Sequence, residues 1–174
     1  SSDLFSADHG LGVGHHGLLG KQNLYEHSTR VPFIVQGPGI PKGKQVEAPI
    51  YLQDVMATSL ALAGVQKPAH VEFHDVLPLA RGESKKSPYK EIYGAYLSAQ
   101  RSITIKDLKV IAYPDVPIIR VYDLAKDPFE KKDLASTPAG KETIKEFFPR
   151  LLKLQAKMGD ALDLRKAFPE LARK

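Results

Sequence analysis

An aspartate and a histidine close the first short apolar run of the chain, and a lysine follows after a glycine-rich loop. Asp8 and His9 come directly after residues 4–7, and Lys21 stands thirteen residues beyond Asp8. Carboxylate oxygens and imidazole nitrogens bind divalent metals, and an ammonium group attracts anions. If the loop turns back, Lys21 faces an anion held by the metal. On spacing alone, a strand, a glycine turn and a solvated basic loop are the favoured reading of the same residues.

Composition describes an ordinary globular chain and excludes several kinds of site. The 174 residues are 43% hydrophobic and 26% charged, which suits one domain or a large domain fragment with a small subdomain. Cysteine is absent, so disulfides, thiolate metal sites and a cysteine nucleophile are excluded. The net charge of +5 would suit an anionic partner. Basic residues are nevertheless mixed with acidic ones and no nucleic-acid motif is present, so a nucleic-acid partner is not predicted.

Nothing in the sequence indicates a membrane partner. No apolar run approaches the length that spans a bilayer, and no basic and apolar leader with a cleavage site is visible. The first residues lead directly into the apolar run that ends at Asp8. We therefore expect either that the chain starts there or that an upstream part has been lost.

Apolar periodicity divides the chain into two blocks. Residues 4–7 and 31–35 read as strands, the second as an apolar run buried on both faces as in a parallel sheet. Asp54 caps a predicted helix that ends at Gly64, and residues 68–88 read as a loop. The apolar side predicted for this helix consists of Val55, Met56, Ser59, Leu60, Leu62 and Ala63.

The second block begins near residue 91. Strands are predicted over 91–97, 101–105, 109–113 and 118–122, at the hairpin spacing of an antiparallel sheet. A helix is predicted from about residue 140 to 158, with a kink or break near Phe148 because Pro149 cannot donate a backbone hydrogen bond.

Four segments, in order along the chain, resemble the second half of a sulfatase of the alkaline-phosphatase superfamily. They are Ser6-Ala7-Asp8-His9-Gly10 with Gly14-His15-His16-Gly17 and Gly20-Lys21; Tyr25-Glu26 with Arg30-Val31-Pro32-Phe33-Ile34; Leu52-Gln53-Asp54-Val55 through Ala63-Gly64-Val65; and Val121-Tyr122-Asp123-Leu124 with Asp127-Pro128-Phe129-Glu130 and Asp133-Leu134-Ala135. Asp133 departs from the asparagine that is common in the family.

The resemblance implies an α/β fold. Residues 1–87 would be the C-terminal part of a mostly parallel sheet domain, the catalytic domain of the family. Residues 88–174 would be a small subdomain with an antiparallel sheet and a C-terminal helix. The change of pattern near residue 90 agrees with that division.

The resemblance also implies roles for the residues of the first segment. Asp8 and His9 would bind a divalent metal, usually calcium in this family, although an imidazole suits zinc or manganese equally well. Lys21 would hold a sulfate oxygen. His16 would bind sulfate or protonate the leaving oxygen. His15 would contact substrate, at a position that is often acidic in relatives.

The nucleophile of the family is absent from this chain. It is a formylglycine made in a C/S-x-P-x-R motif, and neither the Ser28 nor the Ser87 segment has that order. The chain is therefore predicted to be part of a sulfuric ester hydrolase whose N-terminal half supplies the nucleophile, and to be inactive alone. Its substrate would be a small sulfate ester or a sulfated glycan, and export to the periplasm or secretion is expected from the family.

Two other functions remain open at this point. The same superfamily contains phosphodiesterases and phosphonate hydrolases, and a sulfatase-like remnant could act as a binding module without catalysis.

Three further groups of polar residues carry side chains that could form a site. His70, Glu72, His74 and Asp75 could bind a metal, but their segment lacks a helical pattern and a solvated loop is favoured. Glu26 and His27 either orient Lys21 or form a polar turn before a strand. Asp123 and Asp127-Pro128 read as turn formers.

Overall fold

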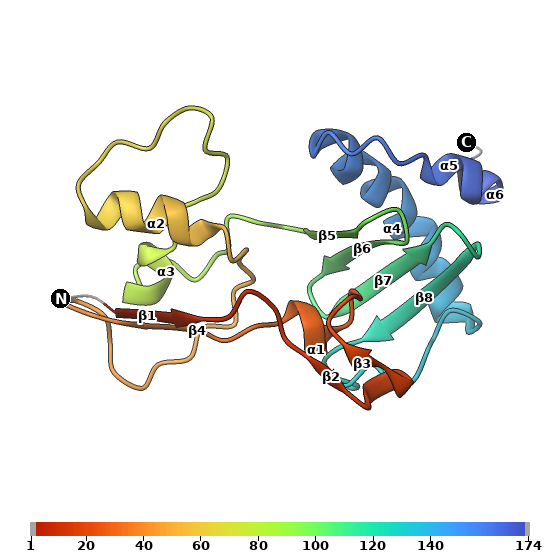
Figure 1. Cartoon of the computed structure of the whole chain (residues 1–174), viewed down its shortest axis with the longest axis horizontal. Helices are drawn as coiled ribbons and strands as arrows, with labels where there is room; N and C mark the ends of the chain where they lie inside the picture. Colours follow the sequence, from red (N-terminus) through yellow and green to blue (C-terminus); the bar gives the residue numbers. More distant parts are fainter. Residues whose placement is uncertain (1–2, 173–174) are drawn as a thin grey trace. The chain divides into compact units, whose positions relative to one another are not determined.

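The computed structural model describes residues 3–172 and divides the chain into two units. Residues 1–8 and 31–90 form the first unit, and residues 9–30 and 91–174 form the second. Figure 1 shows the elements of each unit in sequence colours. No helix among residues 3–172 is long and apolar enough to cross a membrane.

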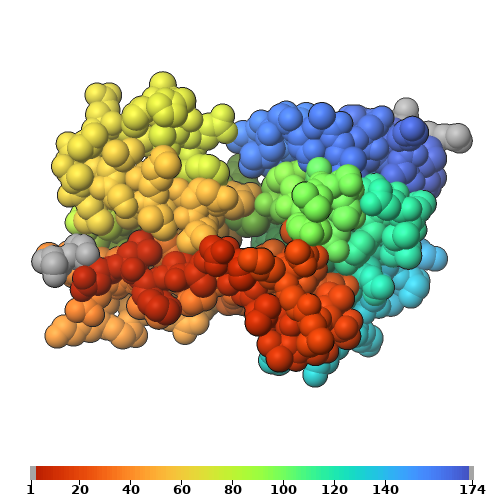
Figure 2. All heavy atoms as spheres, in the orientation of Figure 1, coloured from red at the N-terminus to blue at the C-terminus, as the bar shows by residue number. Residues whose placement is uncertain are grey.

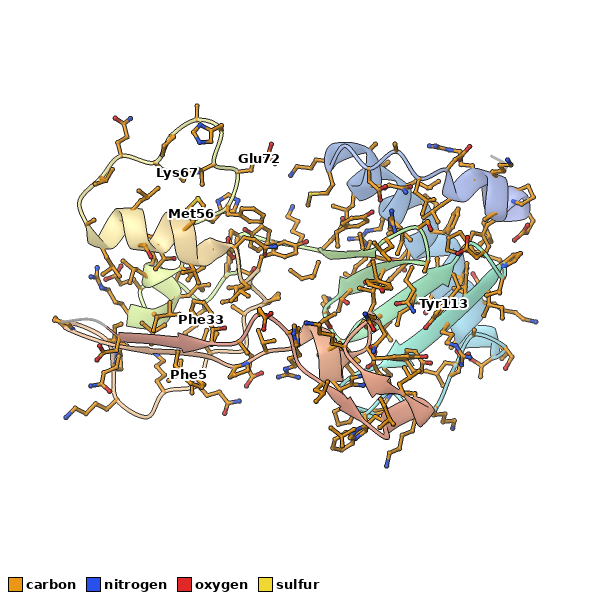
Figure 3. The ribbon with its side chains drawn as sticks, viewed as in Figure 1. Phe5, Phe33, Met56, Lys67, Glu72 and Tyr113 are labelled. Carbon is orange, nitrogen blue, oxygen red and sulfur yellow. The ribbon has the colours of Figure 1, made fainter. Side chains whose placement is uncertain are left out.

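The first unit contains one strand pair and two helices. Strand β1 (Asp3–Ser6) pairs with β4 (Phe33–Gln36) in antiparallel register, with Phe5 opposite Ile34. The expected parallel sheet is therefore not seen among the described residues. Exposure alternates along β4, so the run that reads as buried on both faces is covered on one face only. Figure 3 shows Phe33 on the helix side of the ribbon and Phe5 on the opposite side, where it is 63% exposed.

Helix α2 (Asp54–Leu62) buries a different side from the predicted one. Its buried residues are Asp54, Ala57 and Thr58, whereas Met56 is 58% exposed. The Asp54 carboxylate is fully buried and accepts hydrogen bonds from the backbone N–H groups of Tyr51 and His74, both at 2.9 Å, and from the Tyr89 hydroxyl. The helix therefore buries a polar anchor that holds the neighbouring loops.

A short helix that the sequence did not predict, α3 (Leu77–Arg81), lies within the expected loop of residues 68–88. Pro78 occupies its first turn, where backbone N–H groups make no hydrogen bond within the helix, so the N–H that proline lacks is not needed. Gly82 ends the helix in a left-handed conformation with φ 80°. Pro78 therefore starts a helix instead of breaking one.

The second unit is built on a four-stranded antiparallel sheet in the order β5-β6-β7-β8. The strands are β5 (Ile92–Tyr96), β6 (Gln100–Ile105), β7 (Leu108–Tyr113) and β8 (Ile118–Asp123). They confirm the predicted strands to within one or two residues. Adjacent residues of β7 point to opposite faces, so Val110 and Ala112 belong to one hydrophobic core and Ile111 to another.

Helix α4 (Pro138–Lys157) packs on the first of these faces through Phe147, Phe148 and Leu151. A kink or a break was predicted near Phe148, and the break is wrong, because the helix continues through Pro149. Burial of the two phenylalanines offsets the backbone hydrogen bond that proline cannot make. Two short helices, α5 (Leu164–Ala167) and α6 (Pro169–Ala172), follow it.

The second face of the sheet is covered by residues 9–30. Leu24 and Tyr25 pack against Ile111 and Tyr122, and the Leu24 N–H donates to the Gln100 side chain at 2.9 Å. This segment contains β2 (Gly12–Val13), the 3-10 turn η1 (His15–Gly17), β3 (Leu19–Gly20) and α1 (Glu26–Thr29). The sheet thus supports the loop that carries most of the predicted site residues.

Candidate functional site

The glycine-rich loop folds back on itself as a small ribbon. Gly12 pairs with Gly20 and Val13 with Leu19 in antiparallel register. The reversal passes through η1, where His16 has a left-handed backbone with φ 53° and Gly14 has φ 89°. The ribbon brings the residue after β3, Lys21, back toward the start of the loop. In the space-filling view, much of residues 9–30 lies at the surface on this face (Figure 2).

Lys21 and His9 are in direct contact. The Lys21 Nζ lies 2.5 Å from His9 Nε2, and His9 Nδ1 lies 2.8 Å from the Gly10 carbonyl oxygen. A carbonyl can only accept a hydrogen bond, so Nδ1 carries the proton and Nε2 accepts from the lysine. In this arrangement the Nε2 lone pair of His9 faces the Lys21 ammonium group.

This geometry suits His9 as a metal ligand. Metal-binding histidines characteristically donate the second ring N–H to a backbone carbonyl or carboxylate, as His9 does to Gly10. Asp8 is an exposed carboxylate at the end of the first unit. Among residues 3–172, no three His, Asp or Glu side chains are grouped to hold a metal ion. Asp8 and His9 therefore remain a predicted pair of ligands, part of a larger set.

His15 and His16 belong to a second cluster of rings. His16 stacks on Tyr25 with ring centroids 3.9 Å apart, and His15 stacks on Phe129 at 6.0 Å. His27 lies 5.8 Å from both imidazoles. Burial lowers the pKa of His16 and of His27, and the neighbouring imidazoles lower both further. The lowered pKa values favour the neutral form of both rings. If His16 is protonated, it therefore loses that proton more readily than a free imidazole does.

His27 lies directly beneath the ribbon. A Cβ added to Gly12 would come within 2.8 Å of His27 Nε2, and one added to Gly10 within 2.0 Å of the His27 carbonyl oxygen. The His27 Nε2 is buried, and no hydrogen-bond partner for it is found among the described residues. A side chain at Gly10 would collide with backbone, and one at Gly12 would have to displace the His27 ring. The sequence left the role of His27 open between orienting Lys21 and forming a polar turn.

Two charged residues near the loop escaped the sequence analysis. Lys109 on β7 is 2% exposed, and its Nζ lies 2.9 Å from Glu26 Oε1 and 3.2 Å from Glu130 Oε1. Glu130 entered the sequence analysis only within the segment Asp127-Pro128-Phe129-Glu130 that resembles the family. A lysine inside an otherwise apolar strand was the available signal, because a buried ammonium requires an anionic partner.

In the segment 70–75, the alternative metal site, one backbone N–H and one carboxylate make structural hydrogen bonds. The His74 N–H donates to Asp54 at 2.9 Å, and the Asp75 carboxylate accepts from the Leu77 N–H at 2.9 Å, at the start of α3. These contacts agree with the predicted loop. Asp123 and Asp127 likewise accept backbone hydrogen bonds from Lys126 and Lys132 within their turns.

Comparison with known proteins identifies the family. Residues 14–157 match the family model described as N-sulphoglucosamine sulphohydrolase, C-terminal. The chain belongs to this sulfatase family. The matched residues include His15, His16, Lys21 and Glu130.

Curated relatives are sulfatases. The chain is 32% identical over 144 residues to arylsulfatase K of Danio rerio, covering 76% of this chain and 27% of the relative. It is 31% identical to delta 4,5-hexuronate-2-O-sulfatase of Bacteroides thetaiotaomicron, with 78% and 30% covered, and 33% identical to choline-sulfatase of Rhizobium meliloti, with 79% and 27% covered. The chain therefore spans little more than a quarter of the length of these sulfatases.

Solved sulfatase structures share the fold. One, in complex with its substrate D-glucosamine-2-N,6-O-disulfate, matches with a TM-score of 0.82 at 25% identity, covering 92% of this chain and 35% of that chain. A 2-O GAG sulfatase matches with a TM-score of 0.77 at 27% identity, covering 91% and 37%. The phosphonate monoester hydrolase of Agrobacterium radiobacter matches with a TM-score of 0.74 at 22% identity, covering 88% of this chain and 34% of that chain. At this identity the match shows a likeness of fold alone.

Proposed function

We propose that this chain is the C-terminal part of a sulfatase that hydrolyses sulfate esters, and that its glycine-rich loop handles the sulfate group. The observation that carries the proposal is the contact between Lys21 and His9. An exposed ammonium next to an imidazole whose ring orientation is fixed by a backbone carbonyl offers one group for an anion and one for a metal. Family membership and the sulfatase relatives support the same chemistry.

Asp8 and His9 are the residues that would hold the divalent metal, for which calcium is the expected ion. When bound, the metal neutralises negative charge on the reacting sulfate. His9 contributes an imidazole whose orientation is set by the Gly10 carbonyl. Asp8 contributes a hard carboxylate oxygen, the ligand type that calcium prefers. The nucleophile, formylglycine, would come from a part of the protein outside these residues.

Lys21 binds a sulfate oxygen in this proposal. Two unit charges about 4 Å apart attract each other by roughly 4 kcal/mol at an effective dielectric constant near 20, before desolvation is subtracted. Part of this attraction serves catalysis, because negative charge on the sulfate oxygens redistributes in the transition state. The ammonium would exchange its contact with His9 for one with the anion.

His16 is the group proposed to bind sulfate or to protonate the leaving oxygen, and His15 to contact the substrate. A neutral His16 with a lowered pKa needs an acidic source for the proton that it passes on. His15 lies in the exposed ring cluster next to Phe129. A small sulfate ester or a sulfated glycan would be the substrate.

Kinetics of a Lys21 variant in the complete protein test this function. Lys21→Ala should lower kcat/KM for an aryl sulfate by about tenfold or more, the scale of one lost charge-stabilising contact. Lys153→Ala, which removes an exposed lysine from α4, is the matched control and should leave the kinetics unchanged. Unchanged kinetics for Lys21→Ala would remove this residue from the site.

The same assay separates the alternative functions. Turnover of a phosphonate monoester or phosphodiester in preference to an aryl sulfate would favour the other hydrolases of the superfamily. Sulfate-ester binding without turnover by the complete protein would favour a binding module.

A further inference from the structure

A buried ion cluster lies beneath the glycine-rich loop. Lys109 and Glu130 are each 2% exposed, and both ion-pair distances from Lys109 to Glu26 and Glu130 are within 3.2 Å. One ammonium thus faces two carboxylates. Removing charges from water costs several kcal/mol for each ion unless its partners are well placed. Burial raises the pKa of Glu130, and the Lys109 ammonium opposes this shift.

Glu130 also caps helix α1. Its Oε2 accepts a hydrogen bond from the Glu26 N–H at 2.6 Å, across 104 residues of sequence. The residue at the N-cap position, Tyr25, makes no side-chain cap of its own. A helix of a single turn does not form without tertiary support. Glu130 has a left-handed backbone with φ 54°, a conformation that costs about 1 kcal/mol or more in a residue other than glycine, and its side-chain contacts offset that cost.

Helix α1 in turn supports the backbone of the loop. The Gly10 N–H donates to the Ser28 carbonyl at 2.9 Å, and His27 lies against both Gly10 and Gly12 with no space for a side chain there. Gly10 is the residue whose carbonyl accepts from His9, and Gly12 pairs with the residue that precedes Lys21. A shift of α1 would therefore move both partners of the His9–Lys21 hydrogen bond.

We propose that Glu130 and Lys109 are positioning residues for the His9–Lys21 pair. They fix α1, α1 fixes Gly10 and Gly12, and these glycines set the tautomer of His9 and the place of Lys21. The hydrogen bond and ion pairs given above for Glu130 and Lys109 join them to Glu26 and to each other. The importance of this arrangement for sulfate handling rests on the proposed function, whereas the geometric coupling does not.

The tautomer of His9 provides a direct readout. Long-range nitrogen–proton NMR spectra of the whole 174-residue chain with ¹⁵N-labelled histidine distinguish Nδ1–H from Nε2–H rings. His9 is assigned by comparison with His9→Gln. Spectra are recorded at about pH 8, above the ordinary histidine pKa of about 6.5. The unsubstituted chain should show His9 with the proton on Nδ1.

Glu130→Ala removes both the cap and one carboxylate, so His9 should change to the mixture of tautomers of a free imidazole. Glu130→Gln keeps an oxygen that can accept from the Glu26 N–H and should restore the single tautomer. Asp160→Asn is the matched control, because it weakens another buried ion pair of the same unit, with Arg101. It should lower the melting temperature without changing the His9 spectrum.

A milder variant covers the case in which Glu130→Ala fails to fold. Glu26→Gln keeps the backbone N–H that Glu130 caps and removes only the ion pair with Lys109, so a smaller shift of His9 in the same direction is expected. A His9 spectrum unchanged by the folded variant, with a fall in melting temperature like that of Asp160→Asn, would overturn the proposal. Failure of the proposed function appears separately, as unchanged kinetics of Lys21→Ala.

Discussion

His27 illustrates how a single imidazole connects the two halves of the candidate site. It stacks with His15 and Tyr25, each at 5.8 Å, and its backbone and ring both lie against the glycines of the loop. Its contact partners thus come from η1, from the residue before α1 and from the ribbon that leads to Lys21. A change in the charge of His27 should therefore alter its contacts with all of these segments.

Acidification should therefore destabilise this part of the protein. Burial lowers the pKa of His16 and His27, so the unfolded chain binds protons on these rings at higher pH than the folded chain does. Their stabilising contribution is complete above the unfolded pKa of about 6.5 and is lost as the pH falls through the folded values. We expect the free energy of unfolding, measured with denaturant, to decrease from about pH 7 to pH 5.

His27→Gln should make that decrease smaller. Glu130 makes stability change with pH in the opposite direction because its pKa is raised, but it is present in both proteins. The difference between the two proteins therefore reports on His27 and on its interaction with His15 and His16. His70→Gln, at an exposed position in the other unit, is the control and should leave the pH dependence as it is. An identical slope with and without His27 would contradict the argument.

The sequence allowed residues of the candidate site to be predicted, but not the residues that hold them in position. The spacing of Asp8, His9 and Lys21 around a glycine-rich loop was visible, and the structure brings His9 and Lys21 together. Glu130 could not be found in this way, because its partners lie 104 and 21 residues away and no local pattern links them. The roles of Asp8, His15 and His16 stay predictions.

Among the secondary-structure elements, helix α4 contains a glycine at which helix propensity favours alanine but a steric clash opposes it. Gly140 lies in its first turn and donates to the Thr137 hydroxyl at 3.0 Å. Alanine is favoured over glycine in helices by about 1 kcal/mol. A Cβ at this position, however, would lie 1.8 Å from the Leu134 carbonyl oxygen, which belongs to the backbone and cannot rotate away.

Gly140→Ala should consequently destabilise the protein, by about 1–3 kcal/mol as for other overpacked sites. Chemical denaturation measures the change. Lys141→Ala, at the exposed neighbouring position, should alter stability by no more than about 0.5 kcal/mol. A stabilised Gly140→Ala protein would show that the segment before α4 adapts.

Elements of the second unit were more predictable than those of the first. Strands β5 to β8 are short runs rich in strand-forming residues and are separated by short turns, so the pattern specifies both the elements and their antiparallel order. The apolar runs of β1 and β4 do not indicate whether the two strands run parallel or antiparallel. A parallel sheet was expected here, whereas β1 and β4 pair in antiparallel register. The face of α2 was misread because its buried positions include Asp54 and Thr58, which are polar.

At the scale of the whole molecule, the loop that carries His9 and Lys21 belongs with the C-terminal sheet. Residues 9–30 share a unit with residues 91–174, although sequence places them beside residues 31–90. Contacts over such separations are not encoded locally. The predicted boundary between domains after residue 87 stays a prediction.

The isolated 174-residue chain should hydrolyse no aryl sulfate and should bind divalent metals weakly. It spans little more than a quarter of its sulfatase relatives, and its described residues contain no group of three acidic or histidine side chains that could hold an ion. Titration calorimetry with calcium and with manganese measures the affinity, and Asp8→Asn with His9→Gln provides the blank. Tight binding that both substitutions abolish would show that these residues complete a site by themselves.

The cap that Glu130 places on α1 has a consequence for the order in which the chain acquires its structure. Glu26 and Glu130 are 104 residues apart. A ribosome adds about 5–20 residues per second, so Glu26 waits on the order of five to twenty seconds before Glu130 is made. Until then the glycine-rich segment has neither its cap nor the sheet beneath it. The residues proposed to bind sulfate are thus translated before the residues that support them and become ordered only afterwards, so a chaperone or protease would meet them first as an unfolded segment.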